Sequence, residues 1–325
     1  MKKLFTCLAV GLLASTTVAS FAQSSNYPDR PIYMVVPLPP GGAADILGRL
    51  ISQQLSQKYH VNVVVENKPG AGGNIGAEYV ARSKPDGYTL LLGTMGIHAT
   101  YKIYHHLSYD PSKDLAPVVV LADMPNILVV PKNSPFHTTQ EIIDAAKKHP
   151  GKLTFGSAGF GSSTHMSGEL FKYDAHVDIQ HVPYKGSAPA DTDLVAGRLN
   201  MIFENLSGAL PFIQTGQMRA IAVTGTQRVP SLPGVPTIAQ SGVPSYAFTA
   251  WMTVAAPGRT PRAIVDKLNR DITAIMLDPS MKQRLSKLGV TPVPGHHNVE
   301  QTDAYIKAQR DEFSKLIDAA HLSAG

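Results

Sequence analysis

The sequence predicts an α/β fold with two lobes, each a mostly parallel sheet flanked by helices. Three observations support this prediction. Strand-like runs alternate with helix-like segments along the chain, which is typical of parallel sheets covered on both faces. The 325 residues, of which 43% are hydrophobic and 16% charged, are enough for about two globular domains. Three loops rich in glycine join strands to helices, and ligands of such folds bind beyond the carboxyl ends of the strands.

The individual elements follow from the hydrophobic periodicity. A helix is expected after Gly42, because Leu47, Ile51 and Leu55 recur every three or four residues. Strands are expected where β-branched and apolar residues cluster, at 31–38, 61–66, 89–92, 115–121, 127–130, 153–156, 178–182, 201–204 and 220–224, with a further strand-like run around Trp251. Further helices are expected at 75–82, 140–149, 164–173, 188–196, 261–277, 279–288 and 299–319.

The first 22 residues form a separate segment. Lys2 and Lys3 precede an uncharged apolar run, and small residues follow before Gln23. The run is shorter than the roughly 20 residues that span a bilayer, so the pattern predicts a secretory signal peptide over residues 1–22. Its removal takes away Cys7, the one cysteine of the chain. We therefore expect an exported, soluble product without thiol or disulfide chemistry.

The charge pattern argues against nucleic-acid binding. The formal net charge is +5, and two of the lysines belong to the expected signal peptide. The other Lys and Arg residues do not form a dense block, and we expect them to be ordinary solvated surface residues. We expect no nucleic-acid partner.

The first glycine-rich loop lies in the stretch VVPLPPGGAADILGRL. Its prolines stiffen the corner, and Gly41 and Gly42 leave the backbone open to a ligand. The helix that follows begins with amide N–H groups that lack internal partners, and these favour an anion. Asp45 either caps this helix or accepts a hydrogen bond from the ligand.

The second and third loops offer hydroxyl groups at further helix starts. GTMGIHA contributes Thr94 and His98, and ligand contact and an ordinary capped helix are both open here. GSAGFGSSTHMSGEL is denser in hydroxyls and glycines than a helix cap requires, which favours an anion-binding nest. We expect the first two loops in one lobe and the third in the other, so an anion held by both occupies the cleft between them. Because no Lys or Arg is evident in these loops, backbone amides and hydroxyls would hold it.

Other motifs are incomplete. PGAGGNIG has Ile75 where a dinucleotide fingerprint needs its third glycine, and YKGS has the wrong order for a phosphate loop. His165 and Glu169 stand four apart on a helix but have no evident third ligand, so no metal or cofactor is expected. His165 itself is a ligand donor, a helix-start donor or a packed core histidine. Asn205 is a ligand contact or a helix N-cap, and Trp251 is expected in core or hinge packing.

Several stretches together resemble the Bug-type solute receptors of tripartite tricarboxylate transporters. The stretches are YPDRPIYMVVPLPPGGAADILGRL, VVVENKPGAGGNIGAEYVARSKPDGYTLLLG, PGKLTFGSAGFGSSTHMSGELFK, HVPYKGSAPADTDLVAGRLNMIFENL and GVPTIAQSGVP. The resemblance implies a periplasmic binding protein of type II, a Venus flytrap. Lobe one would comprise residues 23–124 and 247–325, and lobe two residues 125–246. Leu38 departs from the family pattern, which often has an aromatic residue there.

The resemblance implies a non-enzymatic receptor in the periplasm, which we expect to be a monomer without cofactor. Its ligand would be a small carboxylate, either a di- or tricarboxylate or an aromatic carboxylate such as terephthalate, delivered to membrane permease subunits. The expected ligand-binding residues are Pro40, Gly41, Gly42, Ala43, Asp45, Thr94, Met95, Gly96, Ser157, Gly159, Gly161, Ser162, Ser163, Thr164, His165 and Asn205. Two alternatives are a secreted enzyme that uses His165 or Ser162 on a carboxylate ester, and a carboxylate sensor that docks to a signalling protein.

Overall fold

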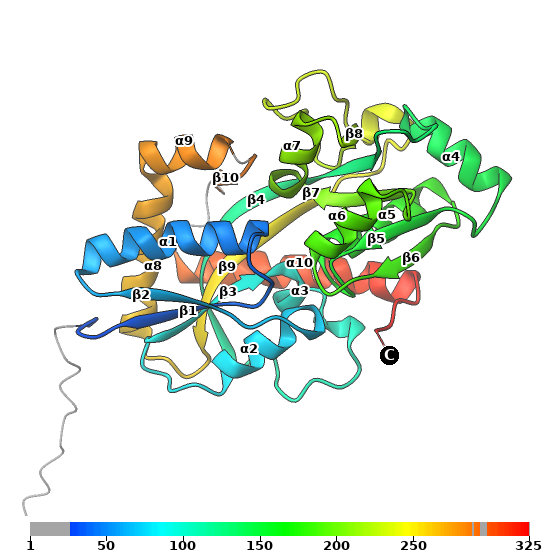
Figure 1. The fold of residues 1–325 in the computed structure, drawn as a ribbon. Coiled ribbons are helices and arrows are strands. Elements are labelled where there is room, and N and C mark those ends of the chain that lie inside the picture. The colour runs from blue at the N-terminus through cyan, green and yellow to red at the C-terminus, as the bar shows by residue number, and fades with distance from the viewer. Residues whose placement is uncertain (1–26, 288, 293–297, 325) are drawn as a thin grey trace, which may run out of the picture.

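A computed structural model describes residues 27–287, 289–292 and 298–324 (Figure 1). The expected signal peptide therefore lies outside the described residues. None of the helices in these ranges combines the length and the apolar character that a bilayer crossing requires.

The strands form one continuous path in the order β2-β1-β3-β9-β4-β7-β5-β6, and β8 and β10 also pair with β4. The strands are β1 (Ile32–Val36), β2 (Val63–Asn67), β3 (Thr89–Thr94), β4 (Leu115–Pro131), β5 (Thr154–Ser157), β6 (Gln180–Pro183), β7 (Met201–Asn205), β8 (Met218–Val223), β9 (Thr249–Pro257) and β10 (Thr291–Pro292). We call the half that contains β1, β2 and β3 the first lobe and the half that contains β5, β6, β7 and β8 the second lobe. Where a helix or strand was predicted with bounds, these agree with the observed ones to within about two residues, except in β4. The helices Met95–His98 and Leu206–Gln214 and the strand β10 were not predicted with bounds.

Parallel pairing is confined to the outer strands of each lobe. β1 pairs parallel with β2 and β3, and β5 pairs parallel with β6 and β7. The strands where the lobes meet pair antiparallel, namely β9 with β3 and β4, and β4 with β7 and β8. The two-lobed α/β fold is confirmed, and the antiparallel strands at its centre are an addition that the alternating pattern did not predict.

The strands predicted at 115–121 and 127–130 are wrong as two elements, because β4 is a single strand. Asp123 and Pro125 interrupt the apolar pattern between them, which suggested a break. The backbone nevertheless stays extended, since β4 keeps its pairing with β9 as far as Pro125 opposite Thr249. From Asn126 onward the same strand pairs with β7 and β8. β4 thus carries the chain from the first lobe into the second.

Buried side chains tie the crossing together. Thr224 donates its backbone N–H and its hydroxyl to the Asn126 carbonyl, both at 2.9 Å, and its hydroxyl oxygen accepts from the Asn126 N–H at 2.8 Å. Phe248 donates its N–H to the Thr224 carbonyl at 2.9 Å, just before the chain re-enters the first lobe as β9. Asn126 and Thr224 are both 0% exposed. The outgoing and returning segments are therefore bonded to each other where they pass between the lobes.

Helices cover both faces of each lobe, as Figure 1 shows. They are α1 (Ala43–Tyr59), α2 (Asn74–Ala81), α3 (Met95–His98), α4 (Thr139–Lys148), α5 (Ser163–Ala175), α6 (Ser187–Val195), α7 (Leu206–Gln214), α8 (Arg262–Leu277), α9 (Pro279–Lys287) and α10 (Val299–Ala319). In β1, Met34 packs with α1 and α8, whereas Val35 packs with α2. In the second lobe, Phe203 packs with α5, and Ile202 packs with α6 and α7. Burial on both faces explains why these strands read as continuous apolar runs.

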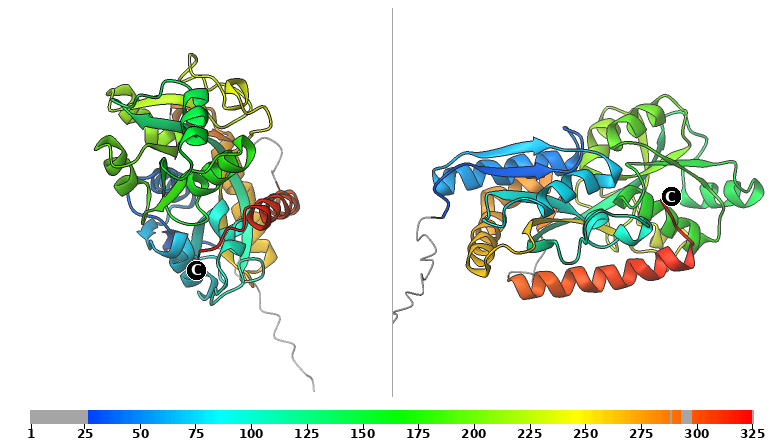
Figure 2. Two further views of the ribbon diagram at one scale, coloured as in Figure 1. Left: turned by 90° about the vertical axis from the view of Figure 1, so that its right-hand side faces the viewer. Right: turned by 90° about the horizontal axis from the view of Figure 1, so that it is seen from below.

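The C-terminal helix α10 runs along both lobes, as Figure 2 shows from below. Its residue Phe313 packs against Phe248 with ring centroids 5.8 Å apart. Phe313 also belongs to the same hydrophobic cluster as Phe155 and Phe171 of the second lobe. The division of the chain at residues 124 and 246 stays a prediction. Because α10 packs against both lobes, it cannot be assigned to lobe one alone.

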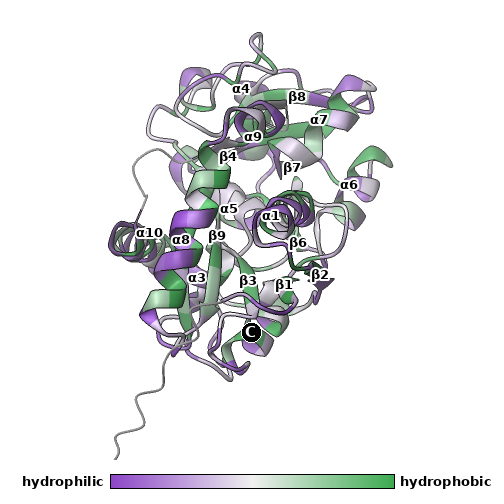
Figure 3. Ribbon diagram, turned by 90° about the vertical axis from the view of Figure 1, so that its left-hand side faces the viewer, coloured by the Kyte–Doolittle hydropathy of each residue, from purple (hydrophilic) through white to green (hydrophobic). Residues whose placement is uncertain are grey.

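Helix α8 shows the amphipathic pattern that its sequence predicts. Figure 3 shows hydrophobic and hydrophilic positions alternating along its ribbon. Val265, Leu268 and Ile272 are buried at helical spacing against the first-lobe sheet. Asn269 is buried beside them and donates to the Val118 carbonyl at 2.7 Å, so its amide N–H is satisfied.

Helix α4 provides a test of stability away from the crossing. Thr138 accepts from the Glu141 N–H at 3.2 Å, and the Glu141 carboxylate accepts from the Thr138 N–H at 3.1 Å, which is a capping box. Thr138→Ala is expected to lower the unfolding free energy by about 0.5–2 kcal/mol, because the helix loses one cap. Urea unfolding measures this. Thr138→Ser keeps the hydroxyl and serves as control, and equal losses in both variants would contradict the assignment.

Candidate functional site

A cavity of about 340 Å³ lies between the lobes and brings residues of all three glycine-rich loops together. Pro40, Gly41, Gly42 and Ala43 border it from the first loop. The second loop contributes Thr94 and Met95, and the third contributes Ala158, Ser162 and Ser163. Asn205 completes the set of predicted residues that line the cavity. The three loops thus converge on one cavity, and the ligand-binding roles of their residues stay predictions.

The first loop turns its bare backbone toward the cavity. Gly41 has φ +88°, a left-handed conformation that disfavours any residue with a side chain. Gly42 has an ordinary extended conformation and is the N-cap residue of α1. A Cβ atom on either glycine would meet no other atom of the described chain within 4 Å. The first amide N–H groups of α1 therefore border open space, as an anion site requires.

Asp45 organises this loop from behind. Its carboxylate accepts from the Gly41 N–H at 3.1 Å, from Arg49 Nε at 2.9 Å and from Asn67 Nδ2 at 2.9 Å. Burial alone would raise the pKa of Asp45, but these hydrogen bonds hold it below its ordinary value. Asp45 is 4% exposed and is not part of the cavity wall. The structure shows neither of the two roles left open for Asp45, since its side chain makes no cap hydrogen bond and does not line the cavity; it positions the loop through the Gly41 N–H instead.

The second loop reaches the cavity at its first two residues only. Thr94 is the N-cap residue of α3, and Met95 is the first residue of that helix. Gly96 lies behind them, where an added Cβ would come within 3.1 Å of the Gly161 carbonyl oxygen. His98 is fully buried and stacks on Trp251 with centroids 6.4 Å apart. Gly96 is thus a site of close approach to the third loop rather than a part of the wall.

The hydroxyl groups of the third loop divide between two roles. Ser157 and Thr164 hold the loop itself, because Ser157 Oγ accepts from the Gly159 N–H at 3.1 Å and Thr164 Oγ1 accepts from the Ala158 N–H at 2.8 Å. Ser162 caps α5 and also donates to the Gly159 carbonyl at 2.6 Å. Ser163 is part of the cavity wall, and its hydroxyl donates to Asn205 Oδ1 at 3.3 Å.

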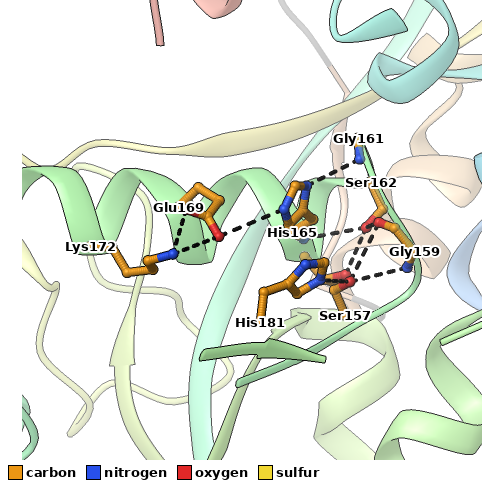
Figure 4. Close-up of polar contacts among 9 residues, drawn as sticks. Ser157, Gly159, Gly161, Ser162, His165, Glu169, Lys172 and His181 are labelled. Atoms are coloured by element: carbon orange, nitrogen blue, oxygen red, sulfur yellow. Dashed lines mark hydrogen bonds and ion pairs between the residues drawn. The ribbon is translucent and has the colours of Figure 1, made fainter. Parts of the chain in front are cut away.

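His165 supports the third loop from inside the second lobe (Figure 4). Its Nδ1 accepts from the Gly161 N–H at 3.1 Å, and its Nε2 lies 3.7 Å from the Glu169 carboxylate. The ring stacks on His181 with centroids 4.0 Å apart. Burial, together with His181 and Lys172, lowers the pKa of His165 well below its ordinary value. Of the three roles open to it, His165 has that of a packed core histidine.

The cluster around His165 is not arranged for metal binding. His165, Glu169 and His181 each place one ligand atom within 4.8 Å of the others. The two imidazole rings lie face to face, however, so their in-plane lone pairs run side by side and do not converge on one point. Ser157 Oγ contacts His181 Nε2 at 2.6 Å, and Lys172 pairs with Glu169 at 2.8 Å. These atoms are engaged with protein groups, and the expectation of no metal stands as a prediction.

The same geometry bears on the esterase alternative. The His165 ring nitrogens face Gly161 and Glu169, while the Ser162 hydroxyl donates to the Gly159 carbonyl. The contact between the two residues joins the His165 backbone N–H to Ser162 Oγ at 3.3 Å. A serine nucleophile needs the imidazole nitrogen as its base, and here that nitrogen points elsewhere.

Two hydrogen bonds join the lobes beside the cavity. Thr100 Oγ1 donates to the Gly161 carbonyl at 2.6 Å, and the Tyr104 hydroxyl donates to the Phe160 carbonyl at 2.8 Å. Gly186 of the second lobe approaches Pro39 of the first, where an added Cβ would meet the proline ring at 3.0 Å. The lobes are therefore in contact both at the third loop and at Gly186.

One wall of the cavity was not predicted from the sequence. Gly186 and Ser187 border it at the start of α6, in the YKGS stretch that resembles a phosphate motif only incompletely. The glycine itself was the available sequence signal, and its φ of +144° shows that this backbone position disfavours other residues. Trp251 was expected in packing. It is 1% exposed and donates to Gln309 at 3.0 Å, but it also lines the cavity.

Two carboxyl groups also belong to the missed wall, Asp191 of α6 and Glu204 of β7. Glu204 Oε1 accepts from Ser187 Oγ and from the Asn205 N–H, both at 2.9 Å. Within the described chain, Glu204 Oε2 and Asp191 Oδ1 are buried without a hydrogen-bond partner. Burial and then the neighbouring Glu204 raise the pKa of Asp191 to about 9, and burial raises that of Glu204. The pair therefore keeps a proton at neutral pH.

Comparison with known proteins agrees with this architecture. The family described as "Tripartite tricarboxylate transporter family receptor" matches residues 47–322. A protein encoded in the tcbD–tcbE intergenic region of Pseudomonas sp. (strain P51) is 40% identical over 96% of this chain and 93% of its own length.

Two solved structures of Rhodopseudomonas palustris proteins are also similar. Rpa4515, solved with adipate, is 39% identical with a TM-score of 0.88, over 91% of this chain and 99% of that one. MatC, solved with bound malate, is 31% identical with a TM-score of 0.84, over 90% of this chain and 100% of that one.

The acidic pair predicts an unusual dependence of stability on pH. Because folding raises its pKa, native Asp191 keeps its proton up to about pH 9, whereas the unfolded chain has lost it above about pH 4. The native state therefore binds one more proton than the unfolded chain between these two pH values. The pair therefore lowers stability as the pH rises through this window. Asp191→Asn is expected to reduce that loss, as urea-unfolding midpoints at pH 5, 7 and 9 would show.

Asp193→Asn on the same helix is the matched control. Asp193 accepts from Tyr184 at 2.7 Å and from Arg198 at 2.6 Å on the outer side of α6, and these bonds lower its pKa. Its replacement should leave the loss of stability above neutral pH in place. If Asp191→Asn and the parent lose the same stability between pH 5 and pH 9, the raised pKa is contradicted.

Proposed function

Because the chain belongs to the tripartite tricarboxylate transporter receptor family, we propose that it binds a small carboxylate between its lobes and delivers it to a membrane permease. Members of this family are solute-binding receptors and not enzymes. The observation that most supports the proposal is the convergence of helix starts on one cavity. α1, α3, α5, α6 and α7 each begin at its wall.

The anion is held by backbone and hydroxyl groups. In the described chain, no Lys, Arg or His lines the cavity. The positive ends of α1 and α5 are therefore the groups that meet a carboxylate. The hydroxyls of Ser162 and Ser163 donate to Gly159 and Asn205 in this arrangement and would have to turn to reach the ligand. Micromolar affinity needs about 8 kcal/mol, and charge-assisted hydrogen bonds contribute about 1.5–3 kcal/mol each. A handful of such donors is enough.

The remaining wall is apolar and suits a short carbon skeleton. Leu38, Phe212, Trp251 and Met252 line the cavity around the polar loops. A volume of about 340 Å³ limits the ligand to a small molecule. Leu38, which replaces a frequent aromatic residue of the family, leaves the wall next to the first loop aliphatic. Adipate and malate, each found in one of the similar proteins, are the first ligands to test.

Ligand binding would favour the closed arrangement of the lobes. The loops that border the cavity come from residues in both lobes, so a ligand that touches both stabilises only the state in which they meet. Lobe one would comprise residues 23–124 and 247–325, and lobe two residues 125–246. The bonds from Thr100 and Tyr104 to the third loop add contacts that exist in this arrangement.

The place of action would be the periplasm. The expected signal peptide over residues 1–22 and the transporter family both support export, and a monomer could carry its ligand to the permease. Delivery has a separate test, since deletion of the receptor should abolish uptake of its labelled ligand while the permease is retained. If uptake persists and a signalling protein is captured with the closed receptor, the sensor alternative replaces delivery.

A screen by thermal shift tests the binding. Adipate, malate, tricarboxylates and terephthalate at millimolar concentration are compared with chloride at the same ionic strength. At least one carboxylate should raise the melting temperature, because a ligand that binds only the native state stabilises it. A folded protein that none of them stabilises would contradict the proposal.

Gly42→Val tests the location of the site. The conformation of Gly42 suits any residue and an added Cβ meets open space, so the variant should fold normally. The new side chain would occupy the anion position, and we expect at least about tenfold weaker binding by calorimetry, equivalent to one lost charge-assisted hydrogen bond. Gly234→Val is the matched control, since its Cβ also meets open space but on the exposed surface. Equal affinity in both variants would place the site elsewhere.

A further inference from the structure

The acidic pair, Asp191 and Glu204, is the least expected part of an anion-binding cavity. Asp191 lies one turn after Ser187 in α6, and Glu204 is the next-to-last residue of β7. Their side chains belong to the cavity wall, and the residues are 4% and 1% exposed. In the described chain, these are the only two ionisable groups in that wall.

The protein itself leaves these carboxyl groups incompletely satisfied. Glu204 Oε1 accepts three hydrogen bonds, from Ser187 Oγ, from the Asn205 N–H and from Asn205 Nδ2 at 3.3 Å. Over the described ranges, Glu204 Oε2 and Asp191 Oδ1 have no partner, although both are buried. Buried polar atoms nearly always find a donor, and an unsatisfied one is costly. The proton that the pair keeps supplies one donor for these oxygens, and a further donor would have to come from what the cavity holds.

Charged protein groups do not compensate the pair. On the outer side of α6, Arg198 is engaged with Asp193 at 2.6 Å, and Asp193 also accepts from Tyr184. On the side of β7 and α7, the contacts of Glu204 come from Ser187 and from Asn205, which are neutral. A second anionic group of a ligand placed here would meet two acids and no protein cation.

The neighbours of the pair place it beside the groups that meet the carboxylate. Asn205 links the two regions, since its N–H donates to Glu204 at 2.9 Å and its side-chain oxygen lies 3.3 Å from Ser163 Oγ. Ser163 is the first residue of α5, whose start faces the anion. A donor group and a carboxylate on adjacent carbon atoms would fit such neighbouring positions.

We propose that Asp191 and Glu204 form a specificity subsite that accepts a hydrogen-bond donor of the ligand, either an ammonium or a hydroxyl group next to its carboxylate. The inference rests on the proposed carboxylate binding and adds the class of ligand. The subsite distinguishes 2-amino and 2-hydroxy carboxylates from plain carboxylates, because the plain ones offer the two acids no hydrogen-bond donor. An ammonium group displaces the proton of the pair to solvent, whereas a hydroxyl group leaves it in place.

The test is calorimetry with matched series at pH 7.5. Succinate, malate and aspartate share one skeleton and differ at one carbon, and glutarate, 2-hydroxyglutarate and glutamate extend the comparison by one carbon. We expect the amino or hydroxy member of the better-bound series to bind at least about tenfold more tightly than the plain member, since a site built for a donor rejects its absence. Equal or tighter binding of the plain member overturns the subsite and leaves carboxylate binding intact. Failure of every carboxylate to bind overturns the proposed function and the subsite together.

The two donor classes give different proton balances. Titration in two buffers of different ionisation enthalpy measures protons released on binding. If protons are released when the tighter ligand binds, the subsite accepts an ammonium group. If no protons are released and the selectivity is retained, it accepts a hydroxyl group.

Variants of the pair test which residues read the donor. Asp191→Asn and Glu204→Gln keep the size of the side chains and should bring the ratio of affinities within a series toward one, without loss of affinity for the plain member. Asp193→Asn, on the side of α6 that does not line the cavity, should keep the parent ratio. If one variant of the pair fails to fold, as its melting curve would show, the other variant and the ligand series on the parent protein still decide. A parent ratio retained in a folded Asp191→Asn or Glu204→Gln overturns the assignment to that residue.

Discussion

Peptide dipoles at the starts of several helices point into one cavity that offers no basic side chain, and much of the structure serves this arrangement. Gly41 and Gly42 keep the start of α1 bare, and Asp45 fixes the loop by taking the Gly41 N–H. On the other lobe, His165 takes the Gly161 N–H from behind and so orients the loop before α5. Each lobe therefore has a buried side chain whose contact with a loop amide shapes the backbone next to the cavity.

Much of the fold could be predicted from the sequence, because each lobe uses local patterns that survive packing. Leu47, Ile51 and Leu55 repeat on one face of α1, and the capping pair around Thr138 marks the start of α4. The join between the lobes could not be predicted in this way. β4 stays extended through Asp123 and Pro125 because its partner β9 lies far away in the sequence.

The candidate site was predictable at the level of loops and not of side chains. Glycine and hydroxyl residues in the sequence indicate which loops border the cavity, but the direction of each side chain depends on tertiary contacts. Ser157 and Thr164 turn to their own loop, and His165 turns to the core. Asp191 and Glu204 escaped notice because they meet only when α6 packs on β7, and an isolated acid in a sequence is usually a solvated one. The direction of His165 likewise depends on its stacking with His181, and burial of the stacked rings lowers the pKa of both histidines.

The bonded crossing between the lobes has a mechanical consequence. Asn126, Thr224 and Phe248 connect the outgoing and returning segments at one buried point, and three of their four hydrogen bonds converge on Thr224 and Asn126 alone. Sliding of one segment past the other would break these bonds, whereas bending both together preserves them. Any opening of the lobes would therefore be a swing about this pivot, in which the loops separate along an arc and return to the same register.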